Sequence, residues 1–297
     1  MAVEKEKRPE YHKRSQFGNI VHRFLRNKTA MVGLVVFLII FLGCILSGFY
    51  MDYHSLAVKQ DIANRFQKPT FDNLRYLFGT DQYGRSVVAR VIFGGRVSLI
   101  SALAVITVST VIGAIMGAIA GFYGGAVDNA IMRVNDVFYS IPYTLMAICI
   151  AATMGGGMVN LCIACIVAVT PGNIRMFRAW VMPLKEADYI GAAKAYGTKD
   201  RRILLRHILP NTLGPIIVQA TLHLAGTIIA VAGLSFIGLG VQMPTPEWGA
   251  ILSEGREYMR DYPYLVVFSG LAILISTLSL NLVGDGLRDA LDPRLKN

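Results

Sequence analysis

Charge is scarce in this chain. Of its 297 residues only 16% are Asp, Glu, Lys or Arg, whereas 54% are hydrophobic. Soluble domains usually carry about 25% charged residues, so the shortage excludes an ordinary soluble protein and a disordered chain. The charge that remains is mostly basic, with a formal net charge of +10. It alternates with long uncharged runs, unlike the basic patches of nucleic-acid-binding modules. We therefore predict a membrane protein that contacts lipid and has no nucleic-acid partner.

Motifs for covalent chemistry are missing as well. The chain has no G-x-x-x-x-G-K-[ST] phosphate loop, no complete G-x-G-x-x-G, no H-E-x-x-H and no G-x-S-x-G. Its four cysteines lie inside uncharged runs, and the C-x-x-C pair Cys162 and Cys165 has no further ligands nearby. We predict no catalytic residue and no metal or cofactor bound by this chain.

Five runs contain no Asp, Glu, Lys or Arg: 29–51, 97–127, 137–174, 208–246 and 262–284. A membrane-spanning helix needs roughly 20 apolar residues. The run 137–174 is long enough for two short spans separated at Gly155-Gly156-Gly157. The prediction is therefore an all-α polytopic membrane protein with six transmembrane helices, or five if that break is misread. After the fifth span we expect a re-entrant or surface segment, with Trp248 at headgroup depth.

The basic residues predict the orientation. Segments 1–28 and 175–207 each carry eight Lys or Arg, segment 52–96 carries seven over a longer stretch, and segment 247–263 carries two. Cytoplasmic loops are enriched in Lys and Arg, so both termini and the 175–207 loop are expected in the cytoplasm. The resulting organisation is a cytoplasmic segment 1–29, an anchor helix 30–51, an extracytoplasmic loop 52–96, a five-helix core 97–285 and a cytoplasmic tail 286–297.

His223 is the one ionisable side chain in the middle of the second to sixth predicted spans. An ionisable residue within the membrane is a functional hypothesis by default, and His223 is a candidate for a translocation pathway. The alternative, which we favour on the sequence alone, is a neutral imidazole bonded to a neighbouring helix. The lack of further charges counts against an ion-coupled secondary carrier.

Small residues form a stripe in the second predicted span. Gly113, Gly117 and Gly121 recur every four residues, and such spacing lets two helix backbones approach closely. We predict a tight helix–helix seam there, within the subunit or against a partner subunit.

The 175–207 loop carries the most specific signal. We expect a helix over about 185–196 that ends at Gly197, and a second helix over about 199–208 that ends before Pro210. Ala192 and Ala193 would lie exposed at the bend, in a compact projection suited to a groove on another protein. The alternative is a solvated basic loop that only enforces the topology.

This loop resembles the E-A-A-x-x-x-G-x(9)-I-x-L-P loop of the membrane subunits of ATP-binding-cassette (ABC) importers. Gly191, Ala192, Ala193 and Gly197, followed by Leu209 and Pro210, match its spacing. Gly191 replaces the Glu of the motif, and His207 stands at its Ile position. Glu186 and Ala187 lie just over one helical turn earlier, and Glu186 is not assumed to substitute. In this family the loop seats in an ATPase subunit, which gives Glu186, Ala187, Gly191, Ala192, Ala193, Gly197 and Pro210 as candidate coupling residues.

Further blocks resemble the oligopeptide/dipeptide and nickel importer permeases, in particular the second ("C-type") permease of the pair. They are FGTDQYGR (78–85), GFYGG (121–125) with Val127-Asp128-Asn129, SIP (140–142), GLGVQ (238–242), PTPEWG (244–249) and GDGLRDALDPRL (284–295).

The resemblance implies the ABC type I importer permease fold in the bacterial cytoplasmic membrane. It also implies four kinds of partner: a homologous permease, two cytoplasmic ATPases that use ATP and Mg, an extracytoplasmic substrate-binding protein, and lipid. The expected cargo is a peptide, because the histidines are scattered and the methionines unclustered. Nickel import by the same family is the alternative. An ion-coupled carrier and a membrane-embedded enzyme are more distant alternatives.

Overall fold

The computed structural model describes residues 16–291, and within them the regular elements are helices. The only strand-like pairing in this part is a single bridge between Thr80 and Ser86. The all-α prediction is thus confirmed. Predictions for 1–15 and 292–297, which include most of the N-terminal segment and the last residues of the tail motif, lie outside the described residues.

Five helices are long and apolar enough to cross a membrane. They are α2 (Lys28–Ile45), α4 (Val87–Tyr123), α7 (Met158–Lys185), α10 (Leu209–Phe236) and α12 (Tyr264–Leu291). A sixth span is formed if α5 (Gly125–Tyr139) and α6 (Tyr143–Met154), which meet at 80°, are counted as one broken helix. The shorter helices are α1 (Gln16–Arg26), α3 (Ser47–Tyr50), α8 (Asp188–Ala195), α9 (Asp200–Ile203) and α11 (Trp248–Gly255).

The region before Gly155 differs from the expected simple span. The predicted turn is present, since α6 ends at Met154 and Gly155 has a φ of 83°. However, the chain also breaks at residues 140–142, and α5 begins as early as Gly125. Pro142 explains the break, because it lacks an N–H and disfavours helical backbone at the residue before it.

The glycine stripe of α4 faces α7 of the same chain. A Cβ atom at Gly113 would lie 2.5 Å from the Cβ of Asn173, and one at Gly117 would lie 2.6 Å from the carbonyl oxygen of Ile174. A Cβ at Gly121 would lie 3.0 Å from the Arg178 carbonyl oxygen. Any larger residue at Gly113 or Gly117 would therefore push the two backbones apart.

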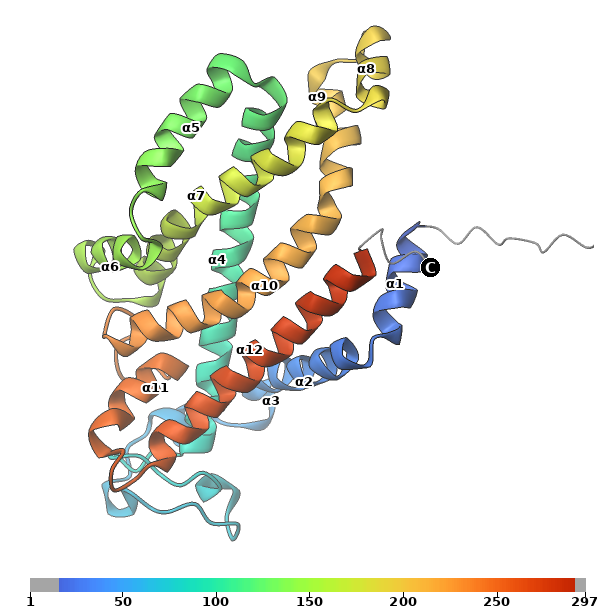
Figure 1. Ribbon diagram of the computed structural model, residues 1–297. Helices are drawn as coiled ribbons and strands as arrows, with labels where there is room; N and C mark the ends of the chain where they lie inside the picture. Colours follow the sequence, from blue (N-terminus) through green and yellow to red (C-terminus); the bar gives the residue numbers. More distant parts are fainter. Residues whose placement is uncertain (1–15, 292–297) are drawn as a thin grey trace, which may run out of the picture.

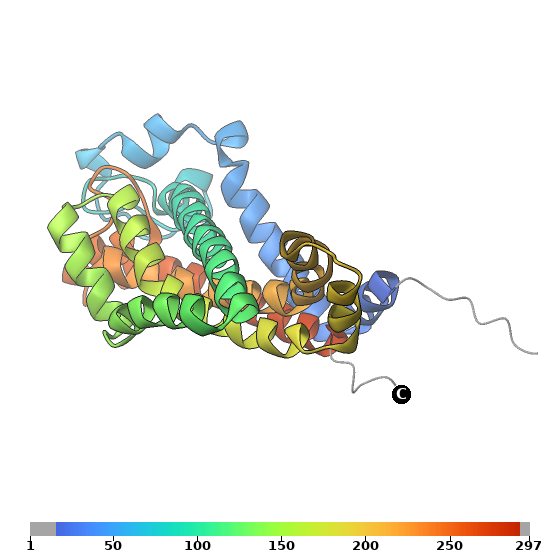
Figure 2. The same ribbon diagram turned by 90° about the horizontal axis from the view of Figure 1, so that it is seen from above.

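The bundle has two distinct ends (Figure 1). At one end lie α8, the corner between α4 and α5, and the start of α10; at the other lie the segment 51–86 and the turn before α12. The start of α2 and the end of α12 lie side by side, with Gly286 against Ala30. The corner of α5 and α6 is on the opposite side of the bundle from α1, as both views show (Figure 2).

Candidate functional site

A projection that we call the knob, residues 186–208, extends beyond the end of α7 (Figure 1). It consists of α8, α9 and the π-helical turn Leu204–Ile208. Asp188 lies in the first turn of α8 and Lys194 in the last, where each charge complements the helix dipole. Gly197, with a φ of 73°, ends α8: its N–H donates to Lys194 O, and the N–H of Thr198 donates to Ala193 O. This is a Schellman cap, which favours glycine.

Apolar side chains attach the knob to the bundle. Ile190, Ile203 and Ile208 are fully buried and pack with Phe122 of α4 and Val181 of α7. Burying one such side chain contributes about 1.5–3 kcal/mol. The knob is therefore held as a packed unit on the ends of two long helices.

The predicted coupling residues differ in exposure. Ala187 and Ala193 are half-buried, and Ala193 packs against the apolar cluster. Tyr196, which sequence reasoning did not single out, is 91% exposed at the end of α8. The remaining predicted residues are exposed: Glu186, Gly191, Ala192, Gly197 and Pro210.

Two details of the expected loop are wrong. The helix α7 continues to Lys185, so residues 175–185 are helical, and α8 begins only at Asp188. The second helix does not end before Pro210. Instead, the chain passes through the π turn directly into α10, with Pro210 in the first turn of α10.

Gly191 and His207, the two departures from the loop motif, both lie at positions that the packing of the knob leaves partly or fully open. A Cβ at Gly191 would meet nothing within 4 Å, so the structure would accept a side chain at this position. His207 is half-buried with its ring 6.5 Å from that of Tyr189, whereas the adjacent Ile208 is fully buried in the knob cluster.

The opposite end holds a buried charge cluster. Segment 51–86, which we call the cap, brings Asp81 and Arg85 against Arg90 of α4 and Glu254 of α11. Arg85 Nε donates to Asp81 at 2.6 Å, and Arg85 Nη2 donates to Glu254 at 2.6 Å. Arg90 Nη2 donates to the other Glu254 oxygen at 2.7 Å. The two arginine side chains are 1% and 2% exposed, so two cations and two anions neutralise one another away from solvent.

Trp248, which the sequence suggested as a residue at headgroup depth, has no surface exposed to lipid. It is fully buried, and its Nε1 donates to the carbonyl of Val91 at 2.8 Å. The preceding Glu247 is also fully buried; its carboxylate accepts from Ser98 Oγ at 2.7 Å and from the Ala250 N–H at 2.9 Å. These bonds cap α11 and fix it to α4.

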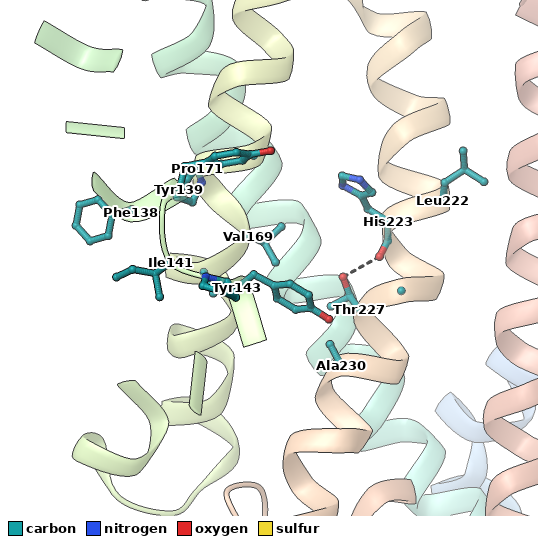
Figure 3. A pocket seen from close by; sticks show the side chains of 14 residues that line it. Phe138, Tyr139, Ile141, Tyr143, Val169, Pro171, Leu222, His223, Thr227 and Ala230 are labelled. Atoms are coloured by element: carbon teal, nitrogen blue, oxygen red, sulfur yellow. Dashed lines mark hydrogen bonds between the residues drawn. The ribbon is translucent and has the colours of Figure 1, made fainter. Parts of the chain in front are cut away.

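A cavity of about 530 Å³ lies between the α5–α6 corner, α7 and α10 (Figure 3). His223 is one of its lining residues, together with Tyr139 and Tyr143, which sequence reasoning missed. His223 is half-buried, and its Nε2 lies 2.6 Å from Nε2 of Gln219. Its hydrogen-bond partner is thus on its own helix and not on a neighbouring one.

Comparison with known proteins gives the family. Residues 109–297 match the family described as binding-protein-dependent transport system inner membrane component. The chain belongs to this family. Residues 15–69 also match the N-terminal transmembrane domain of oligopeptide transport permease C. Both the predicted resemblance and the ABC type I permease fold are therefore confirmed.

Individual relatives cover nearly the whole chain. It is 40% identical to the dipeptide transport system permease protein DppC of Alkalihalophilus pseudofirmus, over 92% of this chain and 88% of the relative. It is 38% identical to the di/tripeptide transport system permease protein DppC of Pseudomonas aeruginosa, over 92% and 91%. It is 39% identical to the glutathione transport system permease protein GsiD of Pectobacterium atrosepticum, over 93% and 90%.

Proposed function

We propose that this chain is the permease subunit of an ATP-driven importer and that its cargo is short peptides. The family match and the relatives support this function, and their names favour a peptide over nickel. In this proposal an extracytoplasmic binding protein delivers the peptide, and a second, homologous permease subunit completes the pathway. The chain itself does no covalent chemistry.

The knob is the proposed seat for an ATPase subunit, and this single feature carries the mechanism. It is a packed projection whose apolar side faces α4 and α7, while Gly191, Ala192 and Tyr196 lie exposed. A rigid attachment transmits movement of a bound partner to the long helices. Closure of two ATPases around ATP and Mg would pull the knobs and tilt the helices, so that the pathway opens alternately to either side.

The proposed orientation places the knob and both termini in the cytoplasm. The distribution of Lys and Arg supports it, since the N-terminal segment and the knob region are the most basic. The start of α2 and the end of α12 lie side by side, as an even number of spans requires. The cap then faces the binding protein.

A charge at Ala192 tests the seat. Ala192 is exposed, whereas Ala193 contributes to the packing of the knob, so Ala192→Glu adds a charge without disturbing the fold. An unpaired charge buried at an interface costs about 2–5 kcal/mol. We expect co-purification of the ATPase and dipeptide-stimulated ATP hydrolysis to fall at least about thirtyfold.

The matched control is Ala126→Glu, at an exposed alanine near the start of α5. It should insert in the membrane equally well and keep ATPase binding. Normal ATPase co-purification together with normal transport in the Ala192→Glu complex would contradict the proposed seat.

A further inference from the structure

The cavity exists because the chain turns sharply between α5 and α6. Residues 138, 139 and 141–143 at this corner form one wall, α7 forms the second and α10 the third (Figure 3). Broken helices form substrate sites in other transporters. A volume of about 530 Å³ lies within the range of about 300–1,000 Å³ that small-molecule sites occupy. A short peptide therefore fits by size.

The polar side chains at this cavity carry no formal charge, and the phenols of Tyr139 and Tyr143 can both donate and accept a hydrogen bond. Tyr139 and Tyr143 point from the corner toward α10, and His223 points back toward them (Figure 3). Thr227 lies one turn further along α10, and its hydroxyl donates to the His223 carbonyl at 2.8 Å. None of the described residues that line the cavity is Asp, Glu, Lys or Arg.

This set of groups suits a peptide backbone better than any one side chain. An amide presents an N–H donor beside a C=O acceptor. A phenol can pair with either, whereas the Thr227 hydroxyl, whose hydrogen is bonded to the His223 carbonyl, can accept from the N–H. The rest of the lining is apolar, with Phe138, Ile141 and Val169 among its members, so it contacts side chains without directional requirements.

A charge pair lies next to the cavity, and its two charges neutralise each other. Arg175 follows the lining residue Gly172 by three positions on α7, and its guanidinium lies 4.1 Å from the ring centroid of Tyr139. Its Nη2 donates to Asp136 at 2.6 Å. A cationic peptide and an anionic one therefore meet the same uncharged interior.

We propose that this cavity is a transit site that binds the backbone of short peptides through Tyr139, Tyr143, His223 and Thr227 and does not discriminate among their side chains. The proposal rests on the proposed function, because it specifies how the same permease recognises its cargo. Selection among peptides is then left to the binding protein.

Transport by the complete reconstituted complex tests this site. The variants Tyr143→Phe, Thr227→Val and His223→Leu each remove a polar group from the cavity. Saturating binding protein would be loaded with Ala-Ala, Lys-Ala or Glu-Ala. Loss of one hydrogen bond corresponds to about a three- to tenfold decrease in rate. We expect that decrease to be the same for all three dipeptides, while their affinity for the binding protein stays unchanged.

Two matched controls lie outside the cavity. Thr221 is on the same helix as Thr227 and makes the same bond to the carbonyl four residues earlier, at 2.8 Å. Tyr123 at the end of α4 is 48% exposed, against 49% for Tyr143. Thr221→Val and Tyr123→Phe should transport at the rate of the unmodified complex.

The outcomes separate the two proposals. Normal transport by the three cavity variants overturns the transit site and leaves the peptide permease intact, and so does a loss confined to one dipeptide. An unmodified complex that transports no dipeptide overturns both.

A second measurement does not depend on those variants folding. In a chain whose four cysteines are replaced by alanine, a hydrophilic maleimide should label His223→Cys, and Ala-Ala delivered by the binding protein should slow the labelling. Leu205→Cys, at a 56% exposed residue of the knob outside the lining, should be labelled without such protection. Equal effects of the dipeptide at both positions would overturn the site.

Discussion

The knob and the cap lie at opposite ends of the bundle, and their attachments differ: both pack through apolar side chains, and the cap adds a buried ion cluster. The knob is held by apolar side chains around Ile190 and Ile203, with its charges in solvent. The cap is held by apolar and aromatic side chains as well, among them Phe78 stacked on Phe268, and in addition by the buried ions of Asp81, Arg85 and Glu254. Apolar contact has no preferred direction, whereas hydrogen-bonded ion pairs fix both distance and angle.

This difference indicates what each end tolerates. A buried ion cluster keeps its geometry only while every partner is present, because a charge left alone is strongly destabilising. An apolar attachment loses stability in proportion to the surface removed. Single charge changes should thus destabilise the cap more than the knob, whereas both should be sensitive to a loss of buried volume.

The largest expected effect comes from removing Glu254. Glu254→Leu leaves Arg85 and Arg90 with Asp81 as a single shared carboxylate for two buried cations, and breaking a buried pair costs about 3–5 kcal/mol. The temperature at which the purified subunit unfolds and stops being monodisperse in detergent should be markedly lower. Glu257→Leu, at an exposed glutamate three residues later, should leave that temperature unchanged. Equal temperatures for the two variants would show that the cluster does not hold the cap.

Sequence reasoning could find features that are local in the chain. Uncharged runs reveal the long spans because a membrane helix satisfies its own backbone and needs only apolar side chains. The knob could likewise be predicted, because Gly197 and the residues that form it are close together in the chain. His223 was noticeable because a single titratable residue stands out in an apolar run.

Features that join distant segments gave no such signal. Arg85 and Glu254 are 169 positions apart, and nothing in either local sequence indicates the other. The helix α5 contains Asp128, Arg133 and Asp136, so a search for uncharged runs excluded it, although together with α6 it is long and apolar enough to count as a sixth span. Tyr139 and Tyr143 are ordinary aromatic residues until the bend at Pro142 directs them toward α10.

An intermediate effect is expected at the knob. Ile203→Ala removes a fully buried side chain from the cluster, and such changes cost about 2–5 kcal/mol. Because α8 and α9 depend on this cluster, hydrogen exchange of their amides should accelerate by more than tenfold, whereas exchange in α4 should not change. Leu205→Ala, at a residue that is 56% exposed, is the matched control. Uniformly faster exchange along the whole chain in Ile203→Ala would contradict an independently attached knob.

The smallest expected effect concerns an ion pair near the knob end of the bundle, which is less buried than the ions of the cap and less exposed than the charges of the knob. Asp128 of α5 accepts two hydrogen bonds of 2.6 Å from Arg178 of α7, and the two side chains are 15% and 27% exposed. Asp136 and Arg175 form a single bond further along the same helices, at 49% and 46% exposure.

Surface pairs contribute about 0–1 kcal/mol, with bidentate geometry at the upper end. Asp128→Asn should therefore lower the unfolding temperature in detergent by a few degrees at low salt, and Asp136→Asn by less. High salt should reduce both differences, because screening weakens exposed pairs most. A larger loss for Asp136→Asn than for Asp128→Asn would mean that the strength of these α5–α7 ion pairs does not increase with their burial.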